Sequence, residues 1–285
     1  MGKLKLTFLG TGTSQGVPMI GCDCKVCKSS DPRDKRLRSS ALVDWDGMRI
    51  LVDAGPDFRW QMLRAGVTHL DAILLTHNHK DHTGGLDDIR AFNYLERKAS
   101  EIWCEEYVAE SLKKEYSYAF EAKKYPGAPE WNIHLIDENP FEVAVYGNTK
   151  LLTWESGVGY SYEDSNQAPK IEKSVKVIPI RGMHYKLPVL GYRFGDIAYC
   201  TDMNYIPEKE FSKLKGLKHF VINTVKNGKH ISHFSLEEAI AVAQKVGAEH
   251  SWLTHLSHQL PCYEELAASL PDDIFPAYDG LVITD

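Results

Sequence analysis

One short stretch of the chain, residues 77–82 (HNHKDH), places three imidazoles and a carboxylate within six residues. It follows an apolar run rich in Ile and Leu, a pattern typical of a buried strand that opens into a loop. Because alternate residues of an extended chain share one face, His77 and His79 can reach the same metal ion. Asp81 and His82 come after the chain has turned, so they can point at a second ion. A solvated polar loop is the competing interpretation, and the density of metal-binding side chains disfavours it.

The remaining ligands must come from elsewhere, because two metal ions need roughly eight protein or solvent positions. His184, Asp202 and His255 each follow a later apolar, strand-like run. The ends of neighbouring strands converge on one rim of a sheet, so single residues far apart in the chain can meet there. Taken alone, His184 would more often be a partly buried histidine with satisfied hydrogen bonds, and Asp202 a turn former or a helix cap. The incomplete first group favours the interpretation of all three as metal ligands.

A second group of metal-binding side chains consists of Cys22, Cys24 and Cys27, three of the six cysteines in the chain. Such a tight group suits a structural zinc ion, which takes four ligands in a tetrahedron. A disulfide is the competing interpretation, but three thiols leave one unpaired, and no signal peptide directs the chain to an oxidising compartment. We therefore expect zinc, and a cytoplasmic protein. The spacing does not identify the fourth ligand.

Residues 76–85 (THNHKDHTGG), followed in order by His184, Asp202 and His255, resemble the metallo-β-lactamase-fold hydrolase superfamily. The resemblance covers most of the chain. Within the superfamily, the chain is most similar to the phosphoribosyl cyclic-phosphate phosphodiesterase family of the carbon–phosphorus lyase pathway. Three segments carry this closer similarity: 10–18, 184–192 and 253–259.

The resemblance implies a role for each candidate ligand. Asp202 would bridge two divalent ions, manganese or zinc. Asp53 would orient ligands without binding metal, although a simple turn residue after a strand is the alternative. His258 would complete the structural zinc site with the three cysteines. The remaining ligands divide between the two ions: His77, His79 and His184 on one, and Asp81, His82 and His255 on the other.

The predicted chemistry is hydrolysis by a water that two metal ions activate. Asp202 counts as catalytic because it serves both ions. A leaving alkoxide needs a proton or a positive neighbour, and His233, just ahead of a predicted helix, is the candidate donor, which the resemblance supports. His230, three residues earlier, is the alternative. Lys186 and Arg181 are candidate phosphate contacts, but either could equally be a solvated surface charge.

These side chains need a scaffold of alternating strands and helices, and the chain shows that alternation. Residues 41–44 and 48–52 are predicted to form a hairpin, and residues 236–246 a helix with a capping box at its start. The resemblance implies the arrangement, an α/β, four-layer αββα sandwich in a single domain, 1–285. An aromatic-rich segment at about 92–140 is expected to be an insertion that forms a lid, a substrate wall or an oligomer surface. An ordinary packed subdomain is the alternative for this segment.

Composition supports a soluble enzyme. The 285 residues are 43% hydrophobic with a mean hydropathy of −0.33, and no run approaches the roughly 20 apolar residues of a membrane helix. The net charge of −6 leaves no overall basic surface for nucleic acid. Two divalent cations with the carboxylates of Asp81 and Asp202 nevertheless make the predicted centre cationic, which favours phosphate or carboxylate substrates. We therefore expect a small phosphate-ester substrate without nucleic-acid or membrane partners; a homodimer is compatible with this expectation.

The sequence thus predicts a dinuclear metal phosphodiesterase that acts on small, cyclic phosphate esters. The superfamily motif is weak for substrate, because the same constellation hydrolyses lactams, thioesters, lactones and phosphodiesters. One alternative is a different metallohydrolase, for thioesters, lactones or the 3′ end of transfer RNA; the last would need an extended basic arm, which is not evident. The other is a non-catalytic accessory protein resembling pyrroloquinoline quinone biosynthesis protein B, which the complete ligand set disfavours.

Overall fold

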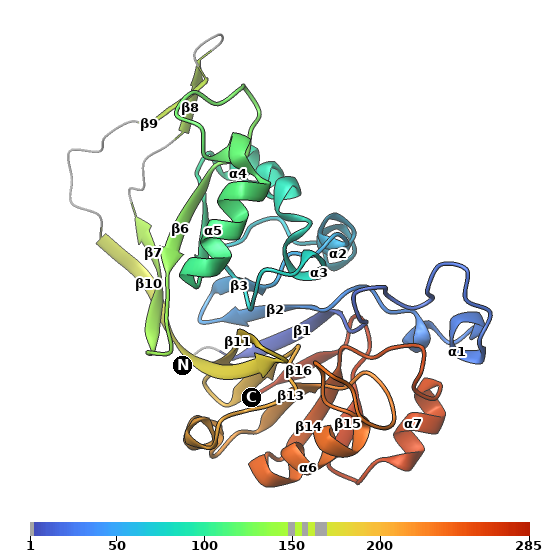
Figure 1. Ribbon diagram of the computed structural model, residues 1–285. Helices are drawn as coiled ribbons and strands as arrows, with labels where there is room; N and C mark the ends of the chain where they lie inside the picture. Colours follow the sequence, from blue (N-terminus) through green and yellow to red (C-terminus); the bar gives the residue numbers. More distant parts are fainter. Residues whose placement is uncertain (1–2, 148–151, 156–158, 163–169) are drawn as a thin grey trace.

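Two seven-stranded sheets form the centre of the molecule (Figure 1). The computed structural model describes residues 3–147, 152–155, 159–162 and 170–285. The first sheet contains β1 (Lys5–Gly10), β2 (Ser40–Trp45), β3 (Met48–Val52), β4 (Ala72–Leu74), β5 (Ser100–Cys104), β6 (Trp131–Leu135) and β16 (Val282–Thr284). The second contains β7 (Phe141–Gly147), β10 (Lys170–His184), β11 (Leu187–Phe194), β12 (Ile197–Cys200), β13 (His219–Asn223), β14 (His250–Thr254) and β15 (Ile274–Pro276). A separate two-stranded sheet pairs β8 (Leu152–Glu155) with β9 (Gly159–Tyr162).

Helices and short 3-10 turns connect the strands. The helices are α1 (Lys25–Lys28), α2 (Phe58–Ala65), α3 (Lys80–Thr83), α4 (Arg90–Glu96), α5 (Glu106–Glu115), α6 (Leu236–Val246) and α7 (Tyr263–Ser269). The 3-10 turns are η1 (Pro32–Asp34), η2 (Leu86–Ile89), η3 (Ser117–Ala119) and η4 (Glu208–Leu214). No helix in the described part of the chain combines the length and the apolar character needed to cross a membrane.

Strand direction places several strand ends at common edges. The first sheet runs β16-β1-β2-β3-β4-β5-β6, and its strands β3 to β6 are mutually parallel. The second runs β15-β14-β13-β12-β11-β10-β7, and its strands β12 to β15 are mutually parallel. In sheets of this kind, ligands bind beyond the carboxyl ends of the parallel strands. The segments after β3, β4, β12 and β14 are therefore the expected place for a site.

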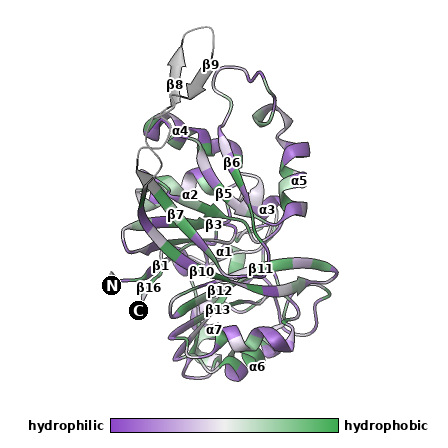
Figure 2. Cartoon of the chain, turned by 90° about the vertical axis from the view of Figure 1, so that its left-hand side faces the viewer, coloured by the Kyte–Doolittle hydropathy of each residue, from purple (hydrophilic) through white to green (hydrophobic). Residues whose placement is uncertain are grey.

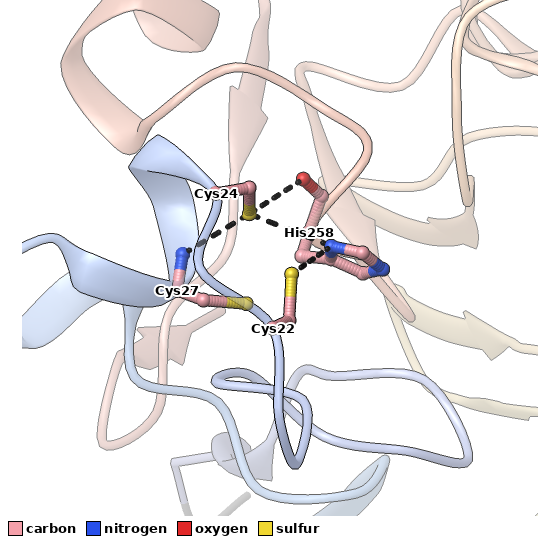
Figure 3. A group of neighbouring side chains, drawn as sticks. All are labelled: Cys22, Cys24, Cys27 and His258. Atoms are coloured by element: carbon pink, nitrogen blue, oxygen red, sulfur yellow. Dashed lines mark hydrogen bonds between the residues drawn. The ribbon is translucent and has the colours of Figure 1, made fainter.

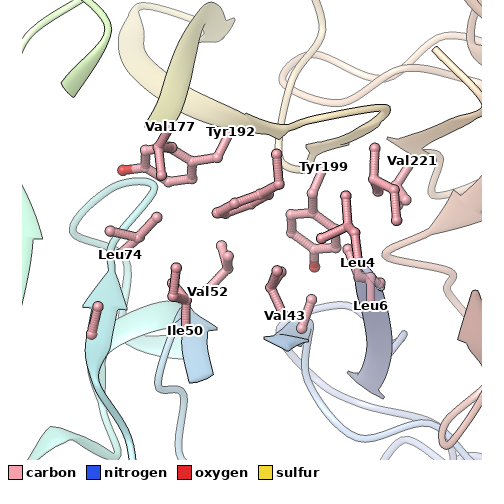
Figure 4. Packing of buried hydrophobic residues seen from close by; sticks show 14 of the residues in the cluster. Leu4, Leu6, Val43, Ile50, Val52, Leu74, Val177, Tyr192, Tyr199 and Val221 are labelled. Atoms are coloured by element: carbon pink, nitrogen blue, oxygen red, sulfur yellow. The ribbon is translucent and has the colours of Figure 1, made fainter. Parts of the chain in front are cut away.

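Three apolar layers hold the sandwich together. Between the sheets, side chains such as Val43 and Ile50 face Tyr192 and Tyr199 of the opposite sheet, as Figure 4 shows. A second layer lies between the first sheet and helices α2 and α5, and a third between the second sheet and helices α6 and α7. Because both faces of each sheet are covered, strands such as β13 are buried at every position. The predicted four-layer αββα sandwich is confirmed.

Local sequence signals fix two elements as predicted. In the hairpin between β2 and β3, Asp46 and Gly47 take positive φ values of 51° and 75°, which a two-residue turn of this type requires. At the start of α6, the Ser235 side chain accepts from the Glu238 backbone while the Glu238 side chain returns to Ser235. Gly247 ends the helix in a left-handed conformation. Figure 2 shows hydrophilic and hydrophobic residues interspersed along α6, as expected of a helix with one buried face.

The aromatic-rich segment 92–140 contributes β5 and β6 to the first sheet, two strands that the sequence did not predict. Trp103 belongs to the layer between the sheets, whereas Tyr116 and Trp131 pack under helix α5 on the outer face. These rings therefore form part of the core rather than a lid, in line with the alternative of ordinary packing. That the segment is an insertion into the sandwich stays a prediction.

Candidate metal centres

Three candidate residues follow their strands in the same unusual backbone conformation. Asp53 after β3, Asp202 after β12 and His255 after β14 have φ values of 63°, 56° and 56°. Few residues other than glycine take a positive φ, and such positions gather at functional sites. His77 and His79 follow β4, and helix α3 begins directly after His79. The strand ends of both sheets thus deliver the predicted residues to one rim.

Asp202 lies at the centre of one group of donor atoms. Its Oδ2 atom is 2.8 Å from His82 Nε2, and its Oδ1 atom is 2.9 Å from His255 Nδ1. Asp81 Oδ2 is 3.3 Å from the same His82 Nε2 atom. One donor atom from each of these four residues lies within 4.8 Å of the others. All four were predicted as ligands, and the structure brings them together.

Asp53 orients two of the histidines from behind. Its Oδ2 atom is 2.7 Å from His82 Nδ1, and it also accepts hydrogen bonds from the backbone and hydroxyl groups of Thr76. Thr76 Oγ1 donates its proton to Asp53, so it can accept the Nδ1 proton of His77, which is 2.9 Å away. In the neutral form, both imidazoles then carry the proton on Nδ1 and present an unprotonated Nε2 atom toward Asp202.

Buried imidazole nitrogens without hydrogen-bond partners indicate whether the site suits metal ions. The Nε2 atoms of His77 and His82 are buried and make no hydrogen bond. His82 Nε2 nevertheless faces the carboxylates of Asp202 and Asp81. A nitrogen lone pair and carboxylate oxygens repel each other at this distance unless a positive charge lies between the nitrogen and the oxygens. Burial opposes a charged imidazole, yet Asp202, Asp81 and Asp53 hold the pKa of His82 well above its ordinary value. Without a metal, this raised pKa favours a proton on His82 Nε2; a divalent cation can displace that proton and bind the imidazole nitrogens beside the carboxylates.

A triad of histidines lies beside this group. The His77 ring centre is 4.5 Å from that of His79 and 5.7 Å from that of His184. His77 Nε2 is 3.7 Å from Asp202 Oδ2, and His184 Nδ1 is buried without a hydrogen bond. His79 is exposed, whereas His77 and His184 are buried. The predicted second ligand set is thus gathered by ring contacts next to Asp202, although its donor atoms are more widely spread than those of the first group.

The two candidate proton donors occupy different places. The His233 ring lies 4.4 Å from the ring of His184 and 4.8 Å from the ring of His255. Burial lowers the pKa of His233 to about 3, so its imidazole is neutral near pH 7. His230 Nδ1 instead faces the backbone N–H groups of Ser232 and His233 at 3.3 Å and shapes the loop between them. Of the two, His233 is the one packed against predicted metal ligands.

The two candidate phosphate contacts also separate. Arg181 makes charge-assisted hydrogen bonds to Glu105 and Glu138, so its guanidinium is already held by two carboxylates. The interpretation of Arg181 as a phosphate contact was therefore wrong. Lys186 lines a cavity of about 530 Å³ that opens onto His79 and His184. It remains a candidate contact for a substrate.

The cysteine group lies on the N-terminal loop around α1, with His258 supplied by the loop after β14 (Figure 3). His258 Nδ1 is 3.3 Å from Cys22 Sγ and 3.5 Å from Cys24 Sγ. The backbone N–H of Cys27 donates to Cys24 Sγ, and this bond together with His258 lowers the pKa of the Cys24 thiol to about 6. All of these cysteines are free thiols. Three sulfur atoms, one of them favoured as a thiolate, and one imidazole match the four-ligand donor set of a structural zinc.

Two residues at the site escaped the sequence interpretation. Thr76 relays the hydrogen bonds of Asp53 to His77, and its position directly before the histidine motif was a signal that could have identified it. Ser39 Oγ donates to the Gly12 carbonyl and lies 3.1 Å from His255 Nδ1. Nothing in the spacing of the chain pointed to Ser39, because its partner lies 216 positions away.

The model of the beta-lactamase superfamily domain matches residues 48–256 of the chain. An octanoyltransferase of Porphyromonas gingivalis (strain ATCC BAA-308 / W83) is 39% identical over 281 residues, which are 98% of this chain and 51% of that protein. The chain thus spans about half the length of this curated relative.

Solved structures extend the comparison. A diphosphatase from the PhnP family has a TM-score of 0.83 and 34% sequence identity, over 100% of this chain and 98% of that one. Zn²⁺-bound PqqB from Methylobacterium extorquens has a TM-score of 0.66 and 18% identity, over 98% of this chain and 99% of that one. At that identity, the likeness to PqqB shows a shared fold alone.

Proposed function

This chain belongs to the beta-lactamase superfamily, and we propose that it is a dinuclear metal phosphodiesterase whose substrates are small, cyclic phosphate esters. One observation carries the proposal. Asp202 lies between the two predicted ligand sets: its Oδ2 atom is 3.7 Å from His77 Nε2 of one set, and its Oδ1 atom is 2.9 Å from His255 Nδ1 of the other. A single carboxylate in this position can serve two cations, as two-metal hydrolysis requires. The similarity to a PhnP-family diphosphatase supports a phosphorus-containing substrate.

The proposed ligand sets follow the geometry of the site. His77, His79 and His184 would hold one ion, Asp81, His82 and His255 the other, and Asp202 would bridge them. This nitrogen and oxygen set tolerates zinc, manganese and iron. The sulfur-rich group of Cys22, Cys24, Cys27 and His258 favours zinc in a structural role. We therefore expect about three metal ions per chain, of which two are catalytic.

The residues of the chain divide the work of hydrolysis. When bound, the two ions would lower the pKa of a water between them toward 7 and offset the charge on the phosphate oxygens. Asp53 keeps the Nε2 atoms of His77 and His82 directed inward. His233, packed between His184 and His255, is placed to donate an N–H hydrogen bond from its neutral imidazole to the departing oxygen. The net charge of −6 argues for a small substrate that the cationic centre attracts, rather than for nucleic acid.

A hydrolysis panel tests the proposal. Protein loaded with manganese or zinc would be given bis-p-nitrophenyl phosphate, a cyclic ribose phosphate, a 2′,3′-cyclic nucleotide, a lactone and a thioester. We expect kcat/KM for the cyclic phosphates to exceed that for the lactone and the thioester by at least about 100-fold, or about 2.7 kcal/mol in transition-state binding. A higher kcat/KM on either carbonyl substrate would overturn the proposed substrate class.

One observation favours a second candidate, the hydrolysis of an acyl thioester. The relative at 39% identity carries the name octanoyltransferase, and a thioester is one activated form from which an acyl group can be released. Half of that relative lies outside the region that this chain matches, so its transferase activity need not reside in the shared part. An octanoyl thioester in the same panel separates the two candidates, because only the second predicts it to be the best substrate.

A further inference from the structure

We propose that the cavity beside the metal centre is a subsite for an aromatic ester arm, such as an aryl group bonded directly to the phosphate oxygen or a nucleobase joined to it through a sugar. The cavity measures about 530 Å³, within the range of pockets that hold drug-sized ligands. The candidate metal ligands His79 and His184 line it together with the apolar side chains of Tyr185, Leu187 and Ile231. This inference rests on the proposed function to the extent that a phosphate occupies the metal end. It adds the chemical class of the group that is attached to this phosphate.

The two apolar walls come from separate loops, and one side chain ties them together. Asn204 Oδ1 accepts a hydrogen bond from the Tyr185 backbone at 2.9 Å, and Asn204 Nδ2 donates to the Ile231 carbonyl at 3.0 Å. Tyr185 and Ile231 are nevertheless 52% and 68% exposed. Two large apolar side chains that are left uncovered, on loops whose backbones one residue ties together, indicate a surface prepared for a ligand.

The backbone conformation at Tyr185 also supports a role of its side chain in ligand binding. Tyr185 and Lys186 form the two-residue tip of the hairpin between β10 and β11, and Tyr185 has a φ of 57°. Turns of this length favour Gly, Asn or Asp where φ is positive. A bulky aromatic residue does not stabilise a turn with this conformation. We therefore attribute the presence of Tyr185 to the position that its ring takes. Tyr185 lines the cavity and directly follows the metal ligand candidate His184 in the chain.

The side chains that line the cavity favour an aromatic ligand. An aromatic ring gains more from a tyrosine face than an aliphatic group of equal size, because the quadrupoles of two rings complement each other. Lys186 Nζ lies 5.3 Å from the centre of the Tyr185 ring. This cation adds an attraction for the charge of the phosphate group, without distinguishing one ester arm from another. The subsite therefore separates the recognition of the arm, by Tyr185, from that of the charge, by Lys186.

Binding of phosphate monoesters to the metal-loaded protein tests this inference independently of turnover. Isothermal titration calorimetry would compare phenyl phosphate, cyclohexyl phosphate and methyl phosphate, which differ only in the arm. We expect wild-type protein to bind phenyl phosphate about tenfold more tightly than methyl phosphate, with cyclohexyl phosphate between them. Tyr185→Asn suits the positive φ and removes the ring, so it should abolish the preference. Tyr185→Phe should retain it.

Two further variants sharpen the result. Lys186→Gln should weaken all three ligands by a similar factor and leave the preference intact. Tyr125→Asn is the matched control, because Tyr125 is 51% exposed but does not line the cavity. Absence of a preference in wild-type protein, equal binding of cyclohexyl and phenyl phosphate, or an undiminished preference in Tyr185→Asn would each overturn the inference. Failure to hydrolyse phosphodiesters would instead count against the proposed function, since the binding result does not depend on it.

Discussion

The two groups of metal-binding side chains are built in opposite ways. The histidine and aspartate group draws its members from the ends of strands in both sheets, and His77, His82, Asp202 and His255 are all buried. The cysteine group draws three ligands from one loop around α1, and its apolar surroundings are a small cluster apart from the three layers of the core. The fold itself therefore positions the first group. The second must rely on its metal to hold the loop, as small metal sites generally do.

This contrast suggests that loss of a side chain should have different consequences in the two groups. Changes in the first group should reduce activity and leave the fold in place, because the sandwich does not need the ions. Changes in the second should reduce stability and leave the chemistry in place.

The largest effect on activity is expected at Asp202. Asp202→Ala should lower kcat by at least about 10⁴-fold, because the residue acts as a unit with both ions and their ligands. Its removal also leaves two cations close together without a carboxylate between them. Metal content, measured by inductively coupled plasma mass spectrometry, should fall as well. Asp57→Ala is the control, since Asp57 pairs with Arg38 outside the group. Wild-type turnover by folded Asp202→Ala protein would remove Asp202 from the mechanism.

The next largest effect is expected at His233. His233→Ala should lower kcat by about 10²–10⁴-fold for alkyl phosphodiesters, whose leaving groups need stabilisation by a hydrogen-bond donor. The loss should be much smaller for bis-p-nitrophenyl phosphate, whose leaving group does not, and metal content should stay unchanged. His230→Ala is the matched control on the same loop. Equal losses on both substrates would indicate phosphate binding instead, and a larger loss in His230→Ala would transfer the role to that residue.

A smaller effect is expected at Asp53. Asp53→Asn should weaken metal affinity by about 10–100-fold, as outer partners of metal ligands generally do. The physical reason is that an amide no longer fixes the protons of His82 and, through Thr76, of His77. Chelator competition measures the affinity, with Asp57→Asn as the control. Unchanged affinity would show that these imidazoles orient themselves without Asp53.

The smallest effect on activity is expected in the cysteine group. Cys24→Ser and His258→Ala should each release one zinc and lower Tm, yet keep kcat within about twofold while the protein stays folded. At this chain length, a destabilisation of 1 kcal/mol corresponds to a Tm shift of about 2–4 °C. Cys262→Ser is the matched control, because Cys262 packs beside the group. A full complement of zinc in His258→Ala would disprove the proposed fourth ligand.

The sequence predicted those parts of the molecule that depend on neighbouring residues. The turn at Asp46 and Gly47 and the capping box at Ser235 follow from local backbone preferences, and both are confirmed. Strands β5 and β6 were missed, because their aromatic residues are divided between two layers that only the complete sandwich creates. Periodicity within one segment does not show which layer a side chain will enter.

In the candidate site, too, the sequence predicted the groups of neighbouring residues and missed the contacts that depend on the tertiary fold. The motif 77–82 and the cysteine spacing are local, and the residues that they singled out do lie together. The contact between Ser39 and His255, the relay through Thr76 and the capture of Arg181 by Glu105 all join residues whose pairing depends on the tertiary fold. Arg181 shows the limit best, since a free arginine and a paired one are identical in sequence.

The left-handed backbone at Asp53, Asp202 and His255 serves the proposed chemistry of the site but adds conformational strain to the chain. Each such residue costs roughly 1–3 kcal/mol that the surrounding fold must offset. Glycine takes this conformation without penalty, so a glycine at any of the three positions should yield a metal-free protein more resistant to unfolding than the corresponding alanine variant. The residues proposed to carry function are thus among the places where the molecule has stability to regain, a trade between activity and stability built into three strand ends.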